Sequence, residues 1–176
     1  VVLNSYEAMP GTFTTRPDPM VEIIREPVGV VAALTSWNAP VSQILCKAVP
    51  AIAAGCTVVV KPSERAPLCG ALLAEAMERA GIPPGVFNLL NGGADCGRAL
   101  AEHPMVDMIS FTGSVAGGAA VAASAAPTIK RVHQELGGKS ANILLDDADF
   151  PGAVRAAVHA CMMNAGQVCA APTRLL

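Results

Sequence analysis

Short runs of β-branched residues alternate along the chain with longer, alanine-rich stretches that have helical spacing. The apolar runs predict strands at residues 28–34, 57–60, 86–90, 108–111, 131–134 and 142–145. The stretches between them predict helices at residues 42–54, 68–80, 95–102, 115–125 and 152–164. Strands that alternate with helices at this spacing favour an α/β fold, in which helices cover both faces of a mostly parallel sheet.

Turn residues mark the ends of the predicted elements. Gly55 follows the first helix, and Gly81 ends the second ahead of a pair of prolines. The first twenty residues differ in character, because Pro10, Pro17 and Pro19 stand there among several threonines. This composition predicts an extended edge segment or a linker in place of a helix.

The composition fits a sheet buried on both faces, with 52% hydrophobic, 15% charged and only 3% aromatic residues. The net charge of −2 provides no basic surface, so we expect no nucleic-acid partner. Residues 28–45 and 48–60 are the most apolar stretches. Both are interrupted by Pro, Gly, Asn or Lys, and neither reaches the roughly 20 apolar residues of a membrane span. We therefore expect no membrane association.

The six cysteines form no C-x-x-C pair and the three histidines are scattered, so we expect no metal site. The chain is long enough to fold without disulfides and shows no signal peptide, which predicts reduced thiols and a cytoplasmic location. The sequence starts at Val1 without an initiator Met and ends on an apolar run at Leu176. We therefore expect a fragment of a longer protein.

Residues 164–169 (Asn-Ala-Gly-Gln-Val-Cys) place a thiol just after a glycine turn that follows a helix. A reactive thiol needs a nearby cation, dipole or base to become a thiolate. No histidine is adjacent in sequence, and His159 lies on the preceding predicted helix. The spacing by itself therefore favours a structural role for Cys169.

Glu135 stands at the end of a predicted strand and is followed by two glycines. The crevice at the carboxyl ends of parallel strands is the usual ligand site of this architecture, which favours a functional carboxylate. A surface ion pair between Glu135 and Lys139 explains the same residues, and the local sequence leaves both interpretations open.

Three further segments follow strands and precede helices. Lys61 and Glu64, three residues apart, are placed to bracket the two hydroxyls of a ribose. Gly113 permits close backbone approach and the helix behind it favours a phosphate, although Ser114 as a helix cap explains the pattern without a ligand. Asn38, beside the only Trp, can donate into the crevice or cap a helix.

In this order the segments resemble the aldehyde dehydrogenase superfamily, with its NAD(P)-dependent hydrolytic members of the betaine-aldehyde and general type. The matching motifs are PVGV at residues 27–30, WNAP at 37–40, KPSE at 61–64, PPGV at 83–86, FTGS at 111–114, ELGGKS at 135–140 and NxGQxC at 164–169. The match runs from about residue 20 to the end of the chain. It implies a Rossmann-like parallel sheet flanked by helices, followed by the start of the catalytic α/β domain.

The resemblance also implies a mechanism and replaces the structural interpretation of Cys169. Cys169 attacks an aldehyde as a thiolate, and the Asn38 side-chain amide and the Cys169 backbone amide hold the thiohemiacetal oxyanion. Loss of hydride to the nicotinamide leaves a thioester, which water activated by Glu135 hydrolyses to a carboxylic acid.

The implied cofactor is NAD. Its implied binding residues are Trp37, Lys61, Ser63, Glu64, Gly113, Ser114 and Leu136. Lys61 and Glu64 take the adenosine ribose, and the turn at Gly113 and Ser114 faces the pyrophosphate. A carboxylate at Glu64 accepts hydrogen bonds from a 2′-hydroxyl and repels a 2′-phosphate, which favours NAD over NADP.

The same resemblance divides the chain into a bridging segment at residues 1–24, an NAD-binding domain at 25–136 and the start of the catalytic domain at 137–176. The parent protein is expected to be a homodimer or homotetramer that acts on a small aldehyde. The later Glu-x-Phe-Gly-Pro segment of the family is absent, and Val115 and Ala116 replace a pair that is often polar. We therefore expect the 176 residues by themselves to be inactive.

Three alternatives stay open. A coenzyme A-acylating dehydrogenase or an NADP-preferring dehydrogenase would have the same fold. Glu135 argues against the acylating enzyme, and Glu64 argues against the preference for NADP. A thiol hydrolase would pair Cys169 with a histidine, and no histidine lies beside the crevice motifs in the sequence. A non-catalytic fragment would bind nucleotide or a partner subunit without turnover.

Overall fold

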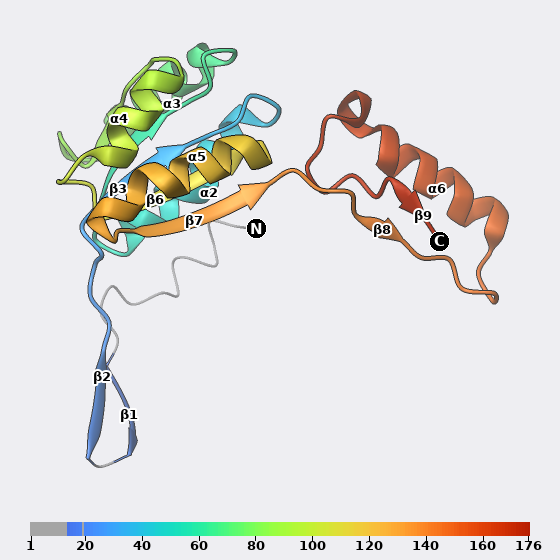
Figure 1. Cartoon of the computed structure of the whole chain (residues 1–176), viewed down its shortest axis with the longest axis horizontal. Helices are drawn as coiled ribbons and strands as arrows, with labels where there is room; N and C mark the ends of the chain where they lie inside the picture. Colours follow the sequence, from blue (N-terminus) through green and yellow to red (C-terminus); the bar gives the residue numbers. More distant parts are fainter. Residues whose placement is uncertain (1–13, 19) are drawn as a thin grey trace.

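The computed structural model describes residues 14–18 and 20–176, and its centre is a five-stranded parallel sheet (Figure 1). The strand order is β5-β4-β3-β6-β7. The strands are β3 (Val30–Leu34), β4 (Thr57–Lys61), β5 (Phe87–Leu89), β6 (Met108–Gly113) and β7 (Arg131–Leu136). Helices α2 (Pro40–Ala53), α3 (Pro67–Arg79), α4 (Ala94–Glu102) and α5 (Val115–Ala125) connect them. The α/β prediction with a parallel sheet is confirmed.

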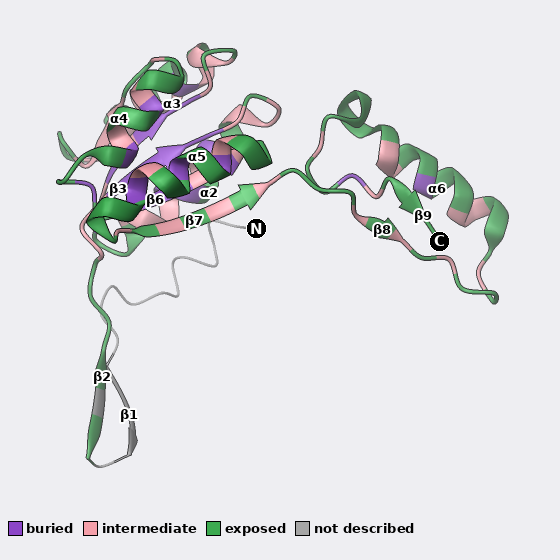
Figure 2. Ribbon diagram, viewed as in Figure 1, coloured by how far each residue is buried: buried purple, intermediate pink, exposed green. Residues whose placement is uncertain are grey.

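Two hydrophobic clusters, one on each face, hold the sheet between its helices. Successive side chains of a strand point to opposite faces, so Val31 and Ala33 of β3 join one cluster while Ala32 and Leu34 join the other. The first cluster includes Ile44 and Ala48 of α2, with Leu73 of α3 packed against it. The second includes Ala101 of α4 with Val121 and Ala125 of α5. Figure 2 shows the resulting concentration of buried residues in the central strands.

The order of the strands creates a point at which the chain changes direction across the sheet. From the central strand β3 the chain moves outward through β4 and β5, then crosses back to β6 and β7 on the other side. The loops after β3 and β6 therefore leave adjacent strands in opposite directions and open a crevice between them. Leu34 and Phe111 are paired neighbours in this register, so Thr35 and Thr112 stand side by side at the crevice.

Most predicted boundaries agree with the structure to within two residues, since the turn residues act as expected. Gly55 and Gly81 follow α2 and α3 with φ angles of 84° and 81°, the left-handed conformation that favours glycine at a helix end. The predicted strand at residues 142–145 is wrong beyond its first residue. Strand β8 covers only Ala141–Asn142, and the side chains of Ile143 and Leu145 are exposed.

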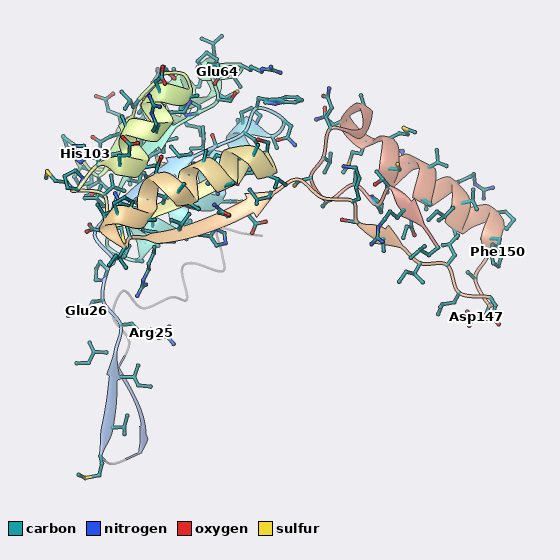
Figure 3. The ribbon with its side chains drawn as sticks, in the orientation of Figure 1. Arg25, Glu26, Glu64, His103, Asp147 and Phe150 are labelled. Atoms are coloured by element: carbon teal, nitrogen blue, oxygen red, sulfur yellow. The ribbon has the colours of Figure 1, made fainter. Side chains whose placement is uncertain are left out.

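Two smaller parts lie outside the central sheet (Figure 1). The antiparallel pair β1 (Thr14–Asp18) and β2 (Val21–Ile24) gives the N-terminal region the predicted extended character, while Pro10 and Pro19 lie outside the described residues. Beyond β7, strand β8 pairs in parallel with β9 (Arg174–Leu175), and α6 (Phe150–Met162) runs between them. Figure 3 shows Asp147 and Phe150 at the end of this C-terminal part that lies farthest from the sheet.

Candidate active site

The carboxyl ends of β3, β4 and β6 open into a cavity of about 820 Å³, which we call the first cavity. Six of the seven residues expected to bind cofactor line it: Trp37, Lys61, Ser63, Glu64, Gly113 and Ser114. The loop at residues 166–169 closes one side of it. Leu136 does not line this cavity, since its side chain fills the space above Gly118 of α5. The crevice predicted from strand order thus gathers most of the expected residues.

Lys61 ends β4 and lines the first cavity. The side chain is buried, and Nζ donates to the carbonyl oxygens of Pro62 at 2.9 Å and Gly92 at 2.6 Å. The Glu64 carboxylate lies 3.9 Å from the same nitrogen and is largely exposed. Figure 3 shows Glu64 on the loop between β4 and α3. The hydrogen-bonded ammonium group of Lys61 and the exposed carboxylate of Glu64 therefore lie at one edge of the cavity. Together they are suited to bind the hydroxyls of a diol or a ribose.

The turn between β6 and α5 ends at Ser114, which caps the N-terminus of α5. The Ser114 hydroxyl accepts a hydrogen bond from the Gly117 amide at 3.0 Å, so its expected capping role is real. A Cβ at Gly113 would lie 2.5 Å from the Phe111 ring, so a side chain there would displace this aromatic residue. The glycine therefore lets the turn approach Phe111 closely, and the start of α5 still faces the cavity, where its dipole favours an anion.

Two buried hydroxyls at the crevice lack partners among the described residues. Thr35 Oγ1 and Thr112 Oγ1 belong to side chains that are more than nine-tenths buried, and neither has a hydrogen-bond partner. Both residues line the first cavity. Buried polar atoms are normally satisfied, so two adjacent unsatisfied hydroxyls indicate a place for a polar ligand. With Lys61, Glu64 and the start of α5, this set fits a dinucleotide.

The loop that carries Cys169 follows α6 through three residues in the left-handed conformation. Asn164, Ala165 and Gly166 have φ angles of 51°, 57° and 77°. Only glycine adopts this region freely, and other residues lose roughly 1–2 kcal/mol there. The predicted glycine turn is therefore confirmed, and two non-glycine residues share its conformation. Such strain is often found near functional sites.

Cys169 borders a second cavity as well as the first. The second cavity, of about 740 Å³, lies between α2 and the edge strand β7. Cys169 and Thr112 line both cavities, and Glu135 lines the second. Cys169 is exposed and carries a free thiol. The candidate nucleophile therefore lies where the candidate cofactor site and the candidate base come together.

Glu135 points from β7 toward the second cavity and lies beside a histidine. His133 occupies the same face of the strand two residues earlier, and its Nε2 is 3.6 Å from Glu135 Oε1. The alternative partner, Lys139, instead donates to the carbonyl oxygen of Gly138. His133 also lines the second cavity, so a histidine does share a cavity with Cys169, contrary to the impression from the sequence. The described hydrogen bonds include none between them.

Lys47 is a charged residue of the second cavity that the sequence analysis did not single out. It lies on α2, is buried, and donates from Nζ to the Ser110 hydroxyl at 3.0 Å. Burial lowers the pKa of Lys47 below its ordinary value, while the negative charges of Glu135 and Cys46 oppose that shift. The available signal in the sequence was that Lys47 is the only charged residue of α2.

The buried position of Lys47 predicts a pH-dependent contribution to stability. The pKa of Lys47 is lower in the folded chain than in the unfolded chain. At pH values between these two pKa values the unfolded state binds more protons, so the free energy of unfolding rises with pH. Relative to Lys47→Met, the wild type should therefore gain free energy of unfolding as the pH rises toward the ordinary lysine pKa of 10.5. Urea denaturation at several pH values measures this difference. Lys139→Met, which removes an exposed lysine, is the control, and a constant Lys47 difference would contradict the prediction.

The fold and site place this chain in the class of α/β proteins that bind ligands at the carboxyl ends of parallel strands. The sequence model of the aldehyde dehydrogenase family matches residues 4–176, and the chain belongs to that family. Over the described residues, no helix is both long and apolar enough to cross a membrane. No described group of His, Cys, Asp or Glu side chains is arranged to hold a metal ion.

Three relatives illustrate the similarity. A 3-succinoylsemialdehyde-pyridine dehydrogenase of Pseudomonas sp is 52% identical over 176 residues, which is 99% of this chain and 36% of that protein. The crystal structure of an aldehyde dehydrogenase C mutant of Pseudomonas syringae, complexed with NAD+ and octanal, is 56% identical with a TM-score of 0.86, covering 96% of this chain and 33% of its own. A structure described as an E. coli NADP dependent enzyme is 42% identical with a TM-score of 0.85, covering 93% and 35%. The chain thus spans about a third of the length of the curated relatives that it matches.

Proposed function

We propose that this chain supplies the nucleophile, the base and much of the cofactor site of an NAD-dependent dehydrogenase that oxidises an aldehyde to a carboxylic acid. The observation that carries the proposal is the position of Cys169, which borders both the cavity with Lys61 and Glu64 and the cavity with Glu135. Membership of the family and the Pseudomonas syringae complex with NAD+ and octanal support the same function.

The proposed chemistry begins at Cys169. Its thiolate attacks the aldehyde carbon, and the carbonyl oxygen becomes the oxyanion of a thiohemiacetal. The Asn38 side-chain amide and the Cys169 backbone amide donate to this oxyanion, and each preorganised donor of this kind contributes about 3 kcal/mol. The chemistry that NAD supplies when bound is the acceptance of two electrons and a hydrogen from the oxidised carbon. Cys169 then carries the acyl group as a thioester.

Glu135 completes the proposed cycle by removing a proton from water that attacks the thioester. It opens onto the same cavity as Cys169, and it is exposed enough to meet solvent. A coenzyme A-acylating enzyme does not need a base for water here, so the carboxylate favours hydrolysis. His133 lines the same cavity, and its Nε2 lies 3.6 Å from Glu135 Oε1.

In the proposed cofactor site, Lys61, Ser63 and Glu64 hold the adenosine ribose, while Gly113 and Ser114 meet the pyrophosphate. Trp37 and the backbone near Leu136 border the same region. The exposed carboxylate of Glu64 favours the free 2′-hydroxyl of NAD. One similar structure is described as NADP dependent, so the preference needs a direct test.

We further propose the division into a bridging segment at residues 1–24, a cofactor domain at 25–136 and the start of a catalytic domain at 137–176. Within residues 137–176, Ala157 and Ala171 are the only buried residues. The cytoplasmic location, the homodimer or homotetramer and the inactivity of the 176 residues by themselves stay predictions.

The proposed function is tested by NADH formation in the full-length protein with a panel of aliphatic aldehydes and semialdehydes. Absorbance at the NADH band should rise only when both NAD and an aldehyde are present. A folded protein that binds NAD but yields no NADH from any aldehyde would overturn the dehydrogenase and leave the non-catalytic alternative. Acyl transfer that depends on added coenzyme A would favour the acylating alternative.

The preference for NAD over NADP is expected to depend on Glu64. Glu64→Ser removes the negative charge that opposes a 2′-phosphate, so the ratio of the NADPH and NADH dissociation constants should fall by about 10-fold or more. Fluorescence titration of the full-length protein with each reduced cofactor measures this ratio. Glu75→Gln, which removes an exposed carboxylate from the outer part of α3, should leave the ratio unchanged. An unchanged ratio in Glu64→Ser would show that another residue selects the cofactor.

A further inference from the structure

Ser36 makes a hydrogen bond that links it to the proposed oxyanion donor. Its hydroxyl donates to Oδ1 of Asn38 at 2.7 Å, and both residues are half-buried at the edge of the first cavity. Nδ2 of Asn38 in turn donates to the carbonyl oxygen of Gln167 at 2.8 Å. The chain of bonds therefore runs from the loop after β3 to the loop that carries Cys169.

The partners of the Asn38 amide fix which way it faces. The Gln167 carbonyl oxygen can only accept a hydrogen bond, so the amide atom that faces it must be the nitrogen. The amide oxygen must then face Ser36, whose hydroxyl is able to donate. A flipped amide would set oxygen against oxygen at Gln167 and would also turn its oxygen toward the loop of Cys169.

The amide nitrogen carries two hydrogens, and only one is used within the described residues. The second hydrogen is available to the oxyanion of the thiohemiacetal, whose carbon is bonded to Cys169 Sγ. Donation by Ser36 to the amide oxygen also polarises the group, which strengthens the hydrogen bonds that its nitrogen donates. Asn164 supports the arrangement from the other side, because its side-chain nitrogen lies 3.4 Å from the carbonyl oxygens of Asn38 and Gln167.

We infer that Ser36 is a positioning residue for aldehyde oxidation, and that it acts by holding the Asn38 amide with its nitrogen toward the Cys169 loop. This inference rests on the proposed function, because it assumes that Asn38 donates to the oxyanion. The serine itself touches neither the sulfur nor the substrate in this account. Its contribution passes entirely through Asn38.

The test is a double-mutant cycle in the full-length protein, with the rate of the first NADH burst as the readout. Ser36→Ala should lower this rate about 3- to 10-fold, the effect of losing one neutral hydrogen bond, while the KM for NAD stays unchanged. Asn38→Ala should lower it about 100-fold or more. Ser36→Ala added to Asn38→Ala should then change the rate less than about 2-fold, because the residue through which it acts is gone. Ser36→Thr keeps a hydroxyl and should restore most of the burst rate.

The outcomes separate this inference from the proposed function. If Asn38→Ala is impaired but Ser36→Ala matches the wild type, the positioning role is wrong and the oxyanion donor stands. An equal loss from Ser36→Ala in both backgrounds would also overturn the inference, since the serine would then act independently of Asn38. A normal burst in Asn38→Ala would remove the oxyanion role of Asn38 and the inference together. Thermal melts of all four variants check that each protein is folded, and coincident melting temperatures exclude a loss through unfolding.

Discussion

Replacement of Cys169 by alanine is expected to abolish aldehyde oxidation in the full-length protein while leaving NAD binding intact. Of the described residues, Cys169 and Thr112 line both cavities, and of these two only Cys169 carries a thiol, which as a thiolate is the stronger nucleophile toward the aldehyde carbon. Without this thiol neither the thiohemiacetal nor the thioester forms, so kcat should fall roughly 10⁴-fold or more. The measurement is NADH formation at saturating aldehyde, together with NAD titration of the same variant.

The matched control for this prediction is Cys161→Ala. Cys161 lies on α6, is half-buried and lines neither cavity, so its removal should leave the rate within about 2-fold of the wild type. Full activity in Cys169→Ala would contradict the covalent mechanism outright. Loss of activity in both variants together with a lowered melting temperature would indicate damage to the C-terminal part and would not support a nucleophile at Cys169.

The inner strands of the sheet could be predicted from the sequence because they are largely apolar, whereas the edge strand β7 (RVHQEL) alternates exposed polar and half-buried residues. β3 and β4 are buried on both faces, and their sequences accordingly contain the continuous apolar runs VVAAL and VVV. The run at residues 142–145 has a similar composition, yet only its first residue belongs to a strand. Among the described strands its partner is the two-residue β9, so the pairing available in the fold, and not the local pattern, sets its length.

The residues of the candidate site that could be predicted from the sequence are those at the ends of predicted strands. Lys61 ends β4, Glu64 lies three residues later and Ser114 follows β6, and the parallel order brings them to one cavity. Ser36 and Lys47 were not singled out, because their significance depends on partners far away in the sequence. Ser36 matters through a bond from Asn38 to Gln167, 129 residues further on, and Lys47 through a bond to Ser110. Local spacing carries no information on such pairs.

Replacement of Glu135 by glutamine is expected to stop the cycle after the first turnover. The glutamine keeps the size of the side chain but cannot remove a proton from water, so the thioester on Cys169 should persist. Rapid mixing with an aldehyde and NAD should show a burst of at most about one NADH per site, followed by a steady rate 10²- to 10⁴-fold below the wild type. The burst rate itself should stay within a few-fold, because Glu135 acts after oxidation.

A stronger nucleophile distinguishes this block from a general loss of activity. Hydroxylamine attacks a thioester without a base, so it should restore turnover in Glu135→Gln and yield the hydroxamate of the acyl group. Glu26→Gln removes a carboxylate from the same second cavity and should behave as the wild type. Unchanged steady turnover in Glu135→Gln would show that another group activates water. Loss of the burst as well would place Glu135 before the thioester, as the base that deprotonates Cys169, because the two residues share one cavity in which a single carboxylate is able to serve either step.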